Sequence, residues 1–147
     1  MKAESDLAEV FERVVRLQVD LFTAVDTRLR RELGILLIAL LPLRVIATRP
    51  DCRVQDIAEG VGISVGGASK SVDRLEHGGW VRRAENPADR RSSVLHLTAE
   101  GERMVSAGTA IIEAEMRSRL LPPLGPAGVA RFATDINQLL GLPQATD

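Results

Sequence analysis

The sequence is poor in the residues that build disulfides, metal sites and membrane spans. Its single cysteine, Cys52, excludes a disulfide within the chain. Two histidines, His77 and His96, with one distant cysteine do not match a metal site. The longest apolar run, residues 35–43, is far shorter than the roughly 20 residues of a membrane span. Acids occupy the N-terminal segment, where a secretory signal has an apolar core. We therefore expect a cytoplasmic protein without cofactor, metal or membrane contact.

An excess of positive charge is also missing. The chain has 19 Lys and Arg against 20 Asp and Glu, which gives a formal net charge of −1. Nucleic-acid-binding domains are often strongly basic, so the overall charge counts mildly against that class. The distribution is uneven, however, because residues 69–92 hold six basic and four acidic side chains. A length of 147 residues is ordinary for a single domain.

Residues 54–79 have the pattern of two short helices joined by a tight turn. Ala58 is small where a second helix must cross closely, and Gly62 falls where the chain reverses, a position that favours positive φ. Ser64 follows as an N-cap. Apolar residues at helical spacing predict the buried face of the second helix: Ala68, Val72 and Leu75. Gly78 and Gly79 end that helix. The order indicates a helix-turn-helix.

The rest of the second helix carries small, polar and basic side chains, namely Gly66, Gly67, Ser69, Lys70, Asp73, Arg74 and His77. The N-terminal part of such a helix usually enters the DNA major groove. Lys70 and Arg74 are therefore candidate DNA contacts, although Arg74 has the alternative of pairing with Asp73 or Glu76. The two glycines either permit close approach to DNA or are simply tolerated near a helix start.

Residues 80–97 predict a two-stranded hairpin. One strand covers residues 80–83, and residues 93–97 alternate so that Leu95 and Leu97 share a face. Residues 86–89 supply turn chemistry, and Arg90 and Arg91 follow at the return of the loop. Arginines on a hairpin suit a narrow, electronegative minor groove, while solvated surface charges are the ordinary alternative.

These residues together resemble the MarR family of bacterial transcription regulators. The resemblance is carried by the turn at residues 57–64, the Ser-Lys-x-x-Asp-Arg-Leu-Glu helix at 69–76 and the Asp-Arg-Arg wing at 89–98, and it extends over nearly the whole chain. It implies a homodimer on a pseudo-palindromic operator, usually a repressor relieved by a small molecule. By position it places the following residues in the major groove: Ser64, Val65, Gly66, Gly67, Ser69, Lys70 and Arg74. It also implies that Arg91, with Arg90, enters the minor groove and that Asp89 orients the arginine.

The flanking segments predict a second, helical region. A stripe of apolar residues begins after a cap at Ser5 or Asp6 and continues through Leu7, Val10, Val14, Leu17 and Leu21. Two further helices are expected from Ala99 to Leu120 or Leu121 and from Gly125–Pro126 to Gly141. These stripes need a partner, most simply a second copy. The fold expected is mainly α with a small β-wing, comprising one domain (1–147) with a winged lobe (36–98) and a dimerisation region (5–32 and 99–141).

Residues 33–47 depart from the family pattern. Leu36 stands where the family usually has a Thr or Ser cap, and Pro42 interrupts the apolar run, so the helix either begins late, near Leu41, or is bent. In relatives with known effectors, ligands often lie between this helix, the first helix and the wing. By that resemblance a small aromatic or apolar effector with at most one acidic group would meet Arg44, Leu40, Leu17 and Leu21.

Other classes of protein fit less well. The glycines at 60–67 superficially resemble a nucleotide-binding loop, but no hydrophobic strand precedes them, so we do not expect an enzyme. A winged helix that docks proteins without specific DNA binding is the main alternative. Among single residues, Trp80 is expected in the core at the base of the wing, Thr98 as a helix cap, and Cys52 as structural rather than redox-active.

Overall fold

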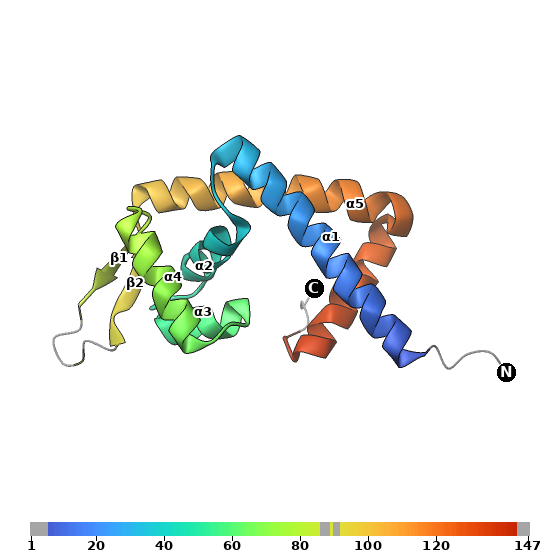
Figure 1. Cartoon of the computed structure of the whole chain (residues 1–147), viewed down its shortest axis with the longest axis horizontal. Helices are drawn as coiled ribbons and strands as arrows, with labels where there is room; N and C mark the ends of the chain where they lie inside the picture. Colours follow the sequence, from blue (N-terminus) through green and yellow to red (C-terminus); the bar gives the residue numbers. More distant parts are fainter. Residues whose placement is uncertain (1–5, 86–88, 90–91, 144–147) are drawn as a thin grey trace. The chain divides into compact units, whose positions relative to one another are not determined.

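The computed structural model describes residues 6–85, 89 and 92–143, which divide into two compact units at Ile111 and Ile112. The fold is mainly helical with one two-stranded antiparallel sheet, as the sequence predicts (Figure 1). The elements, in chain order, are α1 (Leu7–Leu33), α2 (Leu37–Thr48), α3 (Val54–Val61), α4 (Val65–His77), β1 (Val81–Ala84), β2 (Val94–Leu97) and α5 (Ala99–Leu140). No helix in these ranges is both long and apolar enough to cross a membrane.

Helix α1 is capped at both ends by local residues. The Asp6 carboxylate accepts a hydrogen bond from the backbone N–H of Ala8 at 3.0 Å, so the predicted start is confirmed. Gly34, at φ 68°, ends the helix with its N–H donating to the carbonyl of Arg30. Only the C-terminal part of α1 contributes buried residues, which are Val25, Asp26 and Leu29.

Helix α2 begins at Leu37, so the first of the two alternatives, a late start near Leu41, is wrong. Leu36 provides no side-chain cap; the buried carboxylate of Asp26, on α1, accepts from the backbone N–H of Leu37 at 2.8 Å instead. Arg30 Nε lies 2.8 Å from the other oxygen of Asp26. Pro42 is buried inside the helix, where it cannot donate a backbone hydrogen bond. The cap from α1 supplies the polar partner that the apolar start of α2 lacks.

The helix-turn-helix has the predicted geometry. Ile57 and Ala58 of α3 are buried, and Gly62 adopts φ 78° at the C-cap of that helix. Ala68, Val72 and Leu75 form the buried face of α4. Helix α4 ends at His77, followed by Gly79 at φ 81°. Helices α2, α3 and α4 pack on one another, which holds the exposed face of α4 in a fixed orientation.

The wing joins α4 to α5 through backbone contacts. Val81 pairs with Leu97 and Arg83 with Leu95, and the Leu95 N–H also donates to the Cys52 carbonyl at 2.8 Å. The Thr98 hydroxyl accepts from the N–H of Gly101 at 3.1 Å, which confirms the predicted cap, and donates to the Gly79 carbonyl. Trp80 is half-buried at this junction.

Helix α5 contains a break where the sequence predicts a boundary between two helices. Gly125 has φ 65° and ψ 171°, values that no α-helix contains. The segment before the break extends through Pro122 and Pro123, so the expected end at Leu120 or Leu121 is wrong. A glycine at positive φ, rather than the pair of prolines, interrupts the helix.

Candidate nucleic-acid interface

The N-terminal turn of α4 is exposed and carries mostly small side chains. The Ser64 hydroxyl accepts from the backbone N–H of Gly67 at 3.1 Å, which confirms the predicted N-cap. Val65, Gly66 and Gly67 are all exposed. A Cβ added at Gly66 would meet nothing within 4 Å, so packing inside the chain does not require glycine there. The turn leaves the backbone open to close approach by a partner.

Lys70 and Arg74 extend from the same side of α4, one turn apart. Both are exposed, and Ser69 beside them is half-buried. No residue in the described part of the chain forms an ion pair with Lys70 or Arg74. The alternative partners considered for Arg74, Asp73 and Glu76, both pair with another arginine. The two cations on this face are therefore available to an anionic partner such as a phosphate backbone.

That other arginine is Arg83, on the first strand of the wing. Its Nη2 donates to Asp73, and its Nε lies 3.7 Å from Glu76 Oε2. In the sequence, Arg83 stands out only as one of the six basic residues between positions 69 and 92. The signal that could have found this pairing is the hairpin register, since Arg83 lies on the same face of the strand as buried Val81 and so points toward α4.

The tip of the wing is only partly described. Asp89 is exposed, and its carbonyl accepts from both the N–H and the hydroxyl of Ser92 at 3.1 Å. Arg90 and Arg91, the predicted minor-groove contacts, lie outside the described residues. The predicted role of Asp89 in orienting the arginine stays a prediction.

The four residues predicted to meet an effector do not share one environment. Leu17 is exposed on α1, and Leu21 is half-buried. Leu40 is fully buried, and its side chain occupies the space that a Cβ at Gly108 would need. Arg44 lines a pocket of about 240 Å³ between α2 and α3. None of the three leucines lines that pocket.

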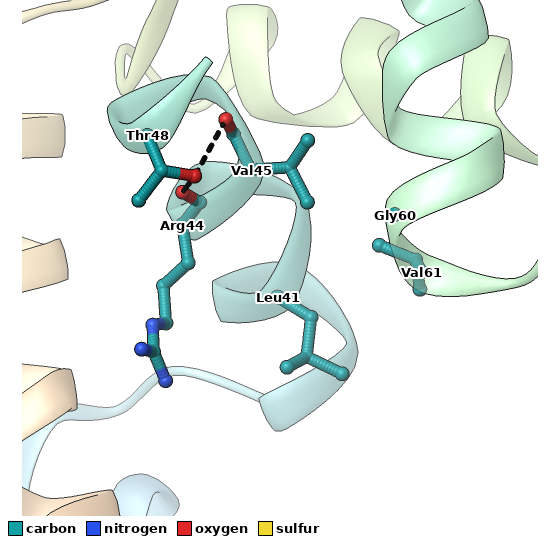
Figure 2. Close-up of a pocket in the computed structure, with 6 residues that line it drawn as sticks. All are labelled: Leu41, Arg44, Val45, Thr48, Gly60 and Val61. Carbon is teal, nitrogen blue, oxygen red and sulfur yellow. Dashed lines mark hydrogen bonds between the residues drawn. The ribbon is translucent and has the colours of Figure 1, made fainter. Parts of the chain in front are cut away.

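The pocket beside Arg44 is apolar apart from one cation and one hydroxyl. Its lining consists of Leu41, Arg44, Val45, Thr48, Gly60 and Val61. Figure 2 shows Leu41 and Val45 facing α3, while the Arg44 side chain extends away from α3. The Thr48 hydroxyl donates to the carbonyls of Arg44 and Val45 at 3.0 and 3.3 Å. The guanidinium of Arg44 has no ion-pair partner in the described part of the chain.

Cys52 lies in the core rather than at a reactive surface. It is 1% exposed, and burial, together with the nearby Asp56 carboxylate, raises the pKa of its thiol to about 11 against the opposing effect of Arg49. A high thiol pKa lowers the reactive thiolate fraction, in accord with a structural role. The residues that the structure describes contain no group of three or more His, Cys, Asp or Glu side chains able to hold a metal ion.

Known proteins of one family resemble this chain in sequence and in fold. The model of the MarR family matches residues 33–92, which contain α2, α3, α4 and β1. The crystal structure of Sco3205, a MarR-family regulator of Streptomyces coelicolor in complex with DNA, superposes with a TM-score of 0.79 at 25% identity, covering 95% of this chain and 87% of that one. This chain therefore resembles the MarR family in sequence over residues 33–92, and it shares the fold of a MarR-family regulator over nearly its whole length.

Two further relatives show how far the likeness extends. CouR of Rhodococcus jostii RHA1, solved bound to p-coumaroyl-CoA, has the same fold over the whole of both chains, with a TM-score of 0.74 at 22% identity. The transcriptional regulator HosA of Escherichia coli O111:H- is 32% identical over 81 residues, which are 53% of this chain and 60% of HosA. The matched segments span about a third to three-fifths of the length of the curated relatives. These curated relatives are transcriptional regulators, which agrees with the expectation that the chain is not an enzyme.

Proposed function

We propose that this chain is a homodimeric, sequence-specific DNA-binding transcriptional regulator of the MarR family that acts in the cytoplasm. The observation that carries the proposal is the exposed face of α4, where Lys70 and Arg74 have no ion-pair partner in the described chain while the opposite face is locked into the core. A helix fixed on one side and cationic on the other is suited to the major groove. The small residues at its start allow the backbone to approach base edges.

The second copy is supported by the surface of α1. Seven large apolar residues between positions 7 and 19 are exposed, namely Leu7, Val10, Phe11, Val14, Val15, Leu17 and Val19. A contiguous apolar surface on a soluble protein marks an interaction site. In a dimer with two-fold symmetry the same stripe would serve both chains and present two α4 helices to successive grooves of a pseudo-palindromic operator. Repression, the usual sign in this family, would follow from occupancy of that operator.

An effector would act through the pocket beside Arg44. The pocket combines apolar walls with one cation that lacks an ion-pair partner, so its chemistry suits a small aromatic or apolar molecule with a single acidic group. Such a ligand would lower DNA affinity only by binding the free form more tightly than the DNA-bound form. We expect benzoate or cinnamate to release DNA from the wild-type protein but not from Arg44→Met. Equal release in both proteins would exclude Arg44.

The test of DNA binding is a fluorescence-anisotropy titration against the duplex upstream of the protein's own gene. We expect binding that resists scrambled competitor, involves two chains per duplex and weakens steeply with salt. Arg91→Ala, outside the described residues, should cost about 1–3 kcal/mol of operator binding. If the protein bound this and other genomic duplexes no more tightly than scrambled DNA, the result would favour the alternative, a winged helix that docks proteins.

A further inference from the structure

Arg83 lies on the inner face of the wing, unlike its neighbour Arg82. In the hairpin register Arg83 is opposite Leu95, a buried residue, and Val81 two positions earlier is also buried. Arg82 pairs with His96 on the outward face and is exposed. Successive side chains of a strand point to opposite faces, so two adjacent arginines have different surroundings. Arg82 therefore provides a matched control for Arg83.

The guanidinium of Arg83 is held by two acids of α4. Nη2 donates to Asp73, Nε lies 3.7 Å from Glu76, and the side chain is 29% exposed. Nε itself is buried and has no hydrogen-bond partner in the described part of the chain. We call Arg83, Asp73 and Glu76 the Arg83 cluster. The cluster joins β1, the first strand of the wing, to α4.

The charges of α4 show why this cluster matters for a polyanionic partner. With His77 counted as neutral, α4 carries two positive side chains, Lys70 and Arg74, and two negative ones, Asp73 and Glu76, so its own charges cancel. Residues three apart on a helix are surface neighbours, which puts the Asp73 carboxylate beside Lys70. Without Arg83, the acids would oppose the attraction between the helix and DNA phosphates.

We propose that Arg83 is a positioning residue for DNA binding, which acts by neutralising Asp73 and Glu76 rather than by touching DNA. This inference rests on the proposed DNA-binding function. It predicts that the effect of removing Arg83 depends on whether the two acids are present. A phosphate-contacting arginine would behave differently, because its loss would weaken binding with or without those acids.

The experiment is a thermodynamic cycle on the upstream duplex. Four proteins are compared by anisotropy: wild type, Arg83→Met, the pair Asp73→Asn with Glu76→Gln, and the combination of all three. Arg83→Met should weaken binding about ten-fold in the wild-type background. In the background of Asp73→Asn with Glu76→Gln it should change binding by less than about three-fold, since contacting sites are non-additive. Arg82→Met should lose less than Arg83→Met. Circular dichroism melts check that each variant is folded.

Salt dependence separates an electrostatic role from a structural one. The loss in Arg83→Met should shrink as salt rises, because exposed charges beyond roughly 10 Å are screened at 0.1 M ionic strength. A loss that persisted at high salt, or a loss of the same size in the background of Asp73→Asn with Glu76→Gln, would overturn the inference while leaving DNA binding intact. If wild type itself bound no duplex specifically, the proposed function would fail first, and the inference with it.

Discussion

The two ends of α1 carry the same apolar periodicity in different surroundings. Near the C-terminus of the helix, Val25 and Leu29 are 4% and 0% exposed, and this end packs on α2. Near its N-terminus, Leu7 and Phe11 are 80% and 68% exposed. One amphipathic pattern is thus satisfied within the chain at one end and left uncovered at the other. Apolar periodicity identifies the face of a helix that becomes buried, but it does not identify the chain that buries it.

Charging the uncovered end should have the largest effect. Val14→Asp with Leu17→Asp places two carboxylates in the exposed stripe and should reduce operator affinity by about 100-fold or more, because two linked half-site contacts become one. Sedimentation should show a monomer. Arg16→Asp is the control, since Arg16 lies about 200° around the helix from Val14. A demonstrated monomer with full affinity would remove the reason for a dimer.

Among the glycines, Gly101 at the start of α5 has the least space for a side chain. A Cβ there would lie 2.2 Å from the backbone oxygen of Trp80, so Gly101→Ala must displace the junction between the wing and α5. We expect a loss of about 3 kcal/mol in the free energy of unfolding. Gly66→Ala, where a Cβ meets nothing within 4 Å, should leave stability unchanged or slightly higher. Urea denaturation measures the free energy of unfolding of both variants. Equal values would mean that the junction shifts to accept the methyl group without loss of stability.

At the covered end of α1, Asp26 caps the start of α2. Asp26→Ala leaves the buried N–H of Leu37 without its acceptor and should cost about 2 kcal/mol. Asp26→Asn keeps an oxygen acceptor and should recover part of that loss. Chemical denaturation at constant pH measures both. If Asn and Ala were equally destabilising, the charge and its contact with Arg30 would matter more than the cap.

The smallest effect is expected at Cys52. With its thiol pKa raised to about 11, the thiolate fraction at pH 8 is about one in a thousand, and the side chain is buried. Iodoacetamide at pH 8 should therefore leave the folded protein unmodified by mass spectrometry and modify it quickly in urea. Because the folded-state pKa is raised, the thiol supports stability at neutral pH and loses that contribution as the pH rises above about 9. Rapid alkylation of the native protein would reopen a redox role.

Sequence reasoning succeeded where a feature depends on near neighbours. Gly62, Ser64 and the buried face of α4 follow from residues a few positions apart, and each is confirmed. It failed where the partner is distant. The cap on α2 comes from Asp26, 11 residues before Leu37, and no local pattern indicates it.

The same distinction between local and distant partners holds for the candidate site. The cations of α4 could be named from the helix alone, whereas the pairing of Arg83 with Asp73 spans ten residues and two kinds of element. Pro42 did not mark the start of the helix, since α2 begins at Leu37 and includes it; the alternative of a bend there stays a prediction. Proline opposes helix locally, but burial in an apolar core and a cap supplied by α1 outweigh that preference here.

The stoichiometry of the complex with the upstream duplex decides whether the protein binds DNA as a dimer. Sedimentation velocity with labelled duplex at fixed salt would measure how many 15.9 kDa chains bind each DNA molecule. The account predicts two chains that bind together, with no populated one-chain complex. Specific binding of a single chain, with the exposed stripe of α1 still free, would contradict it.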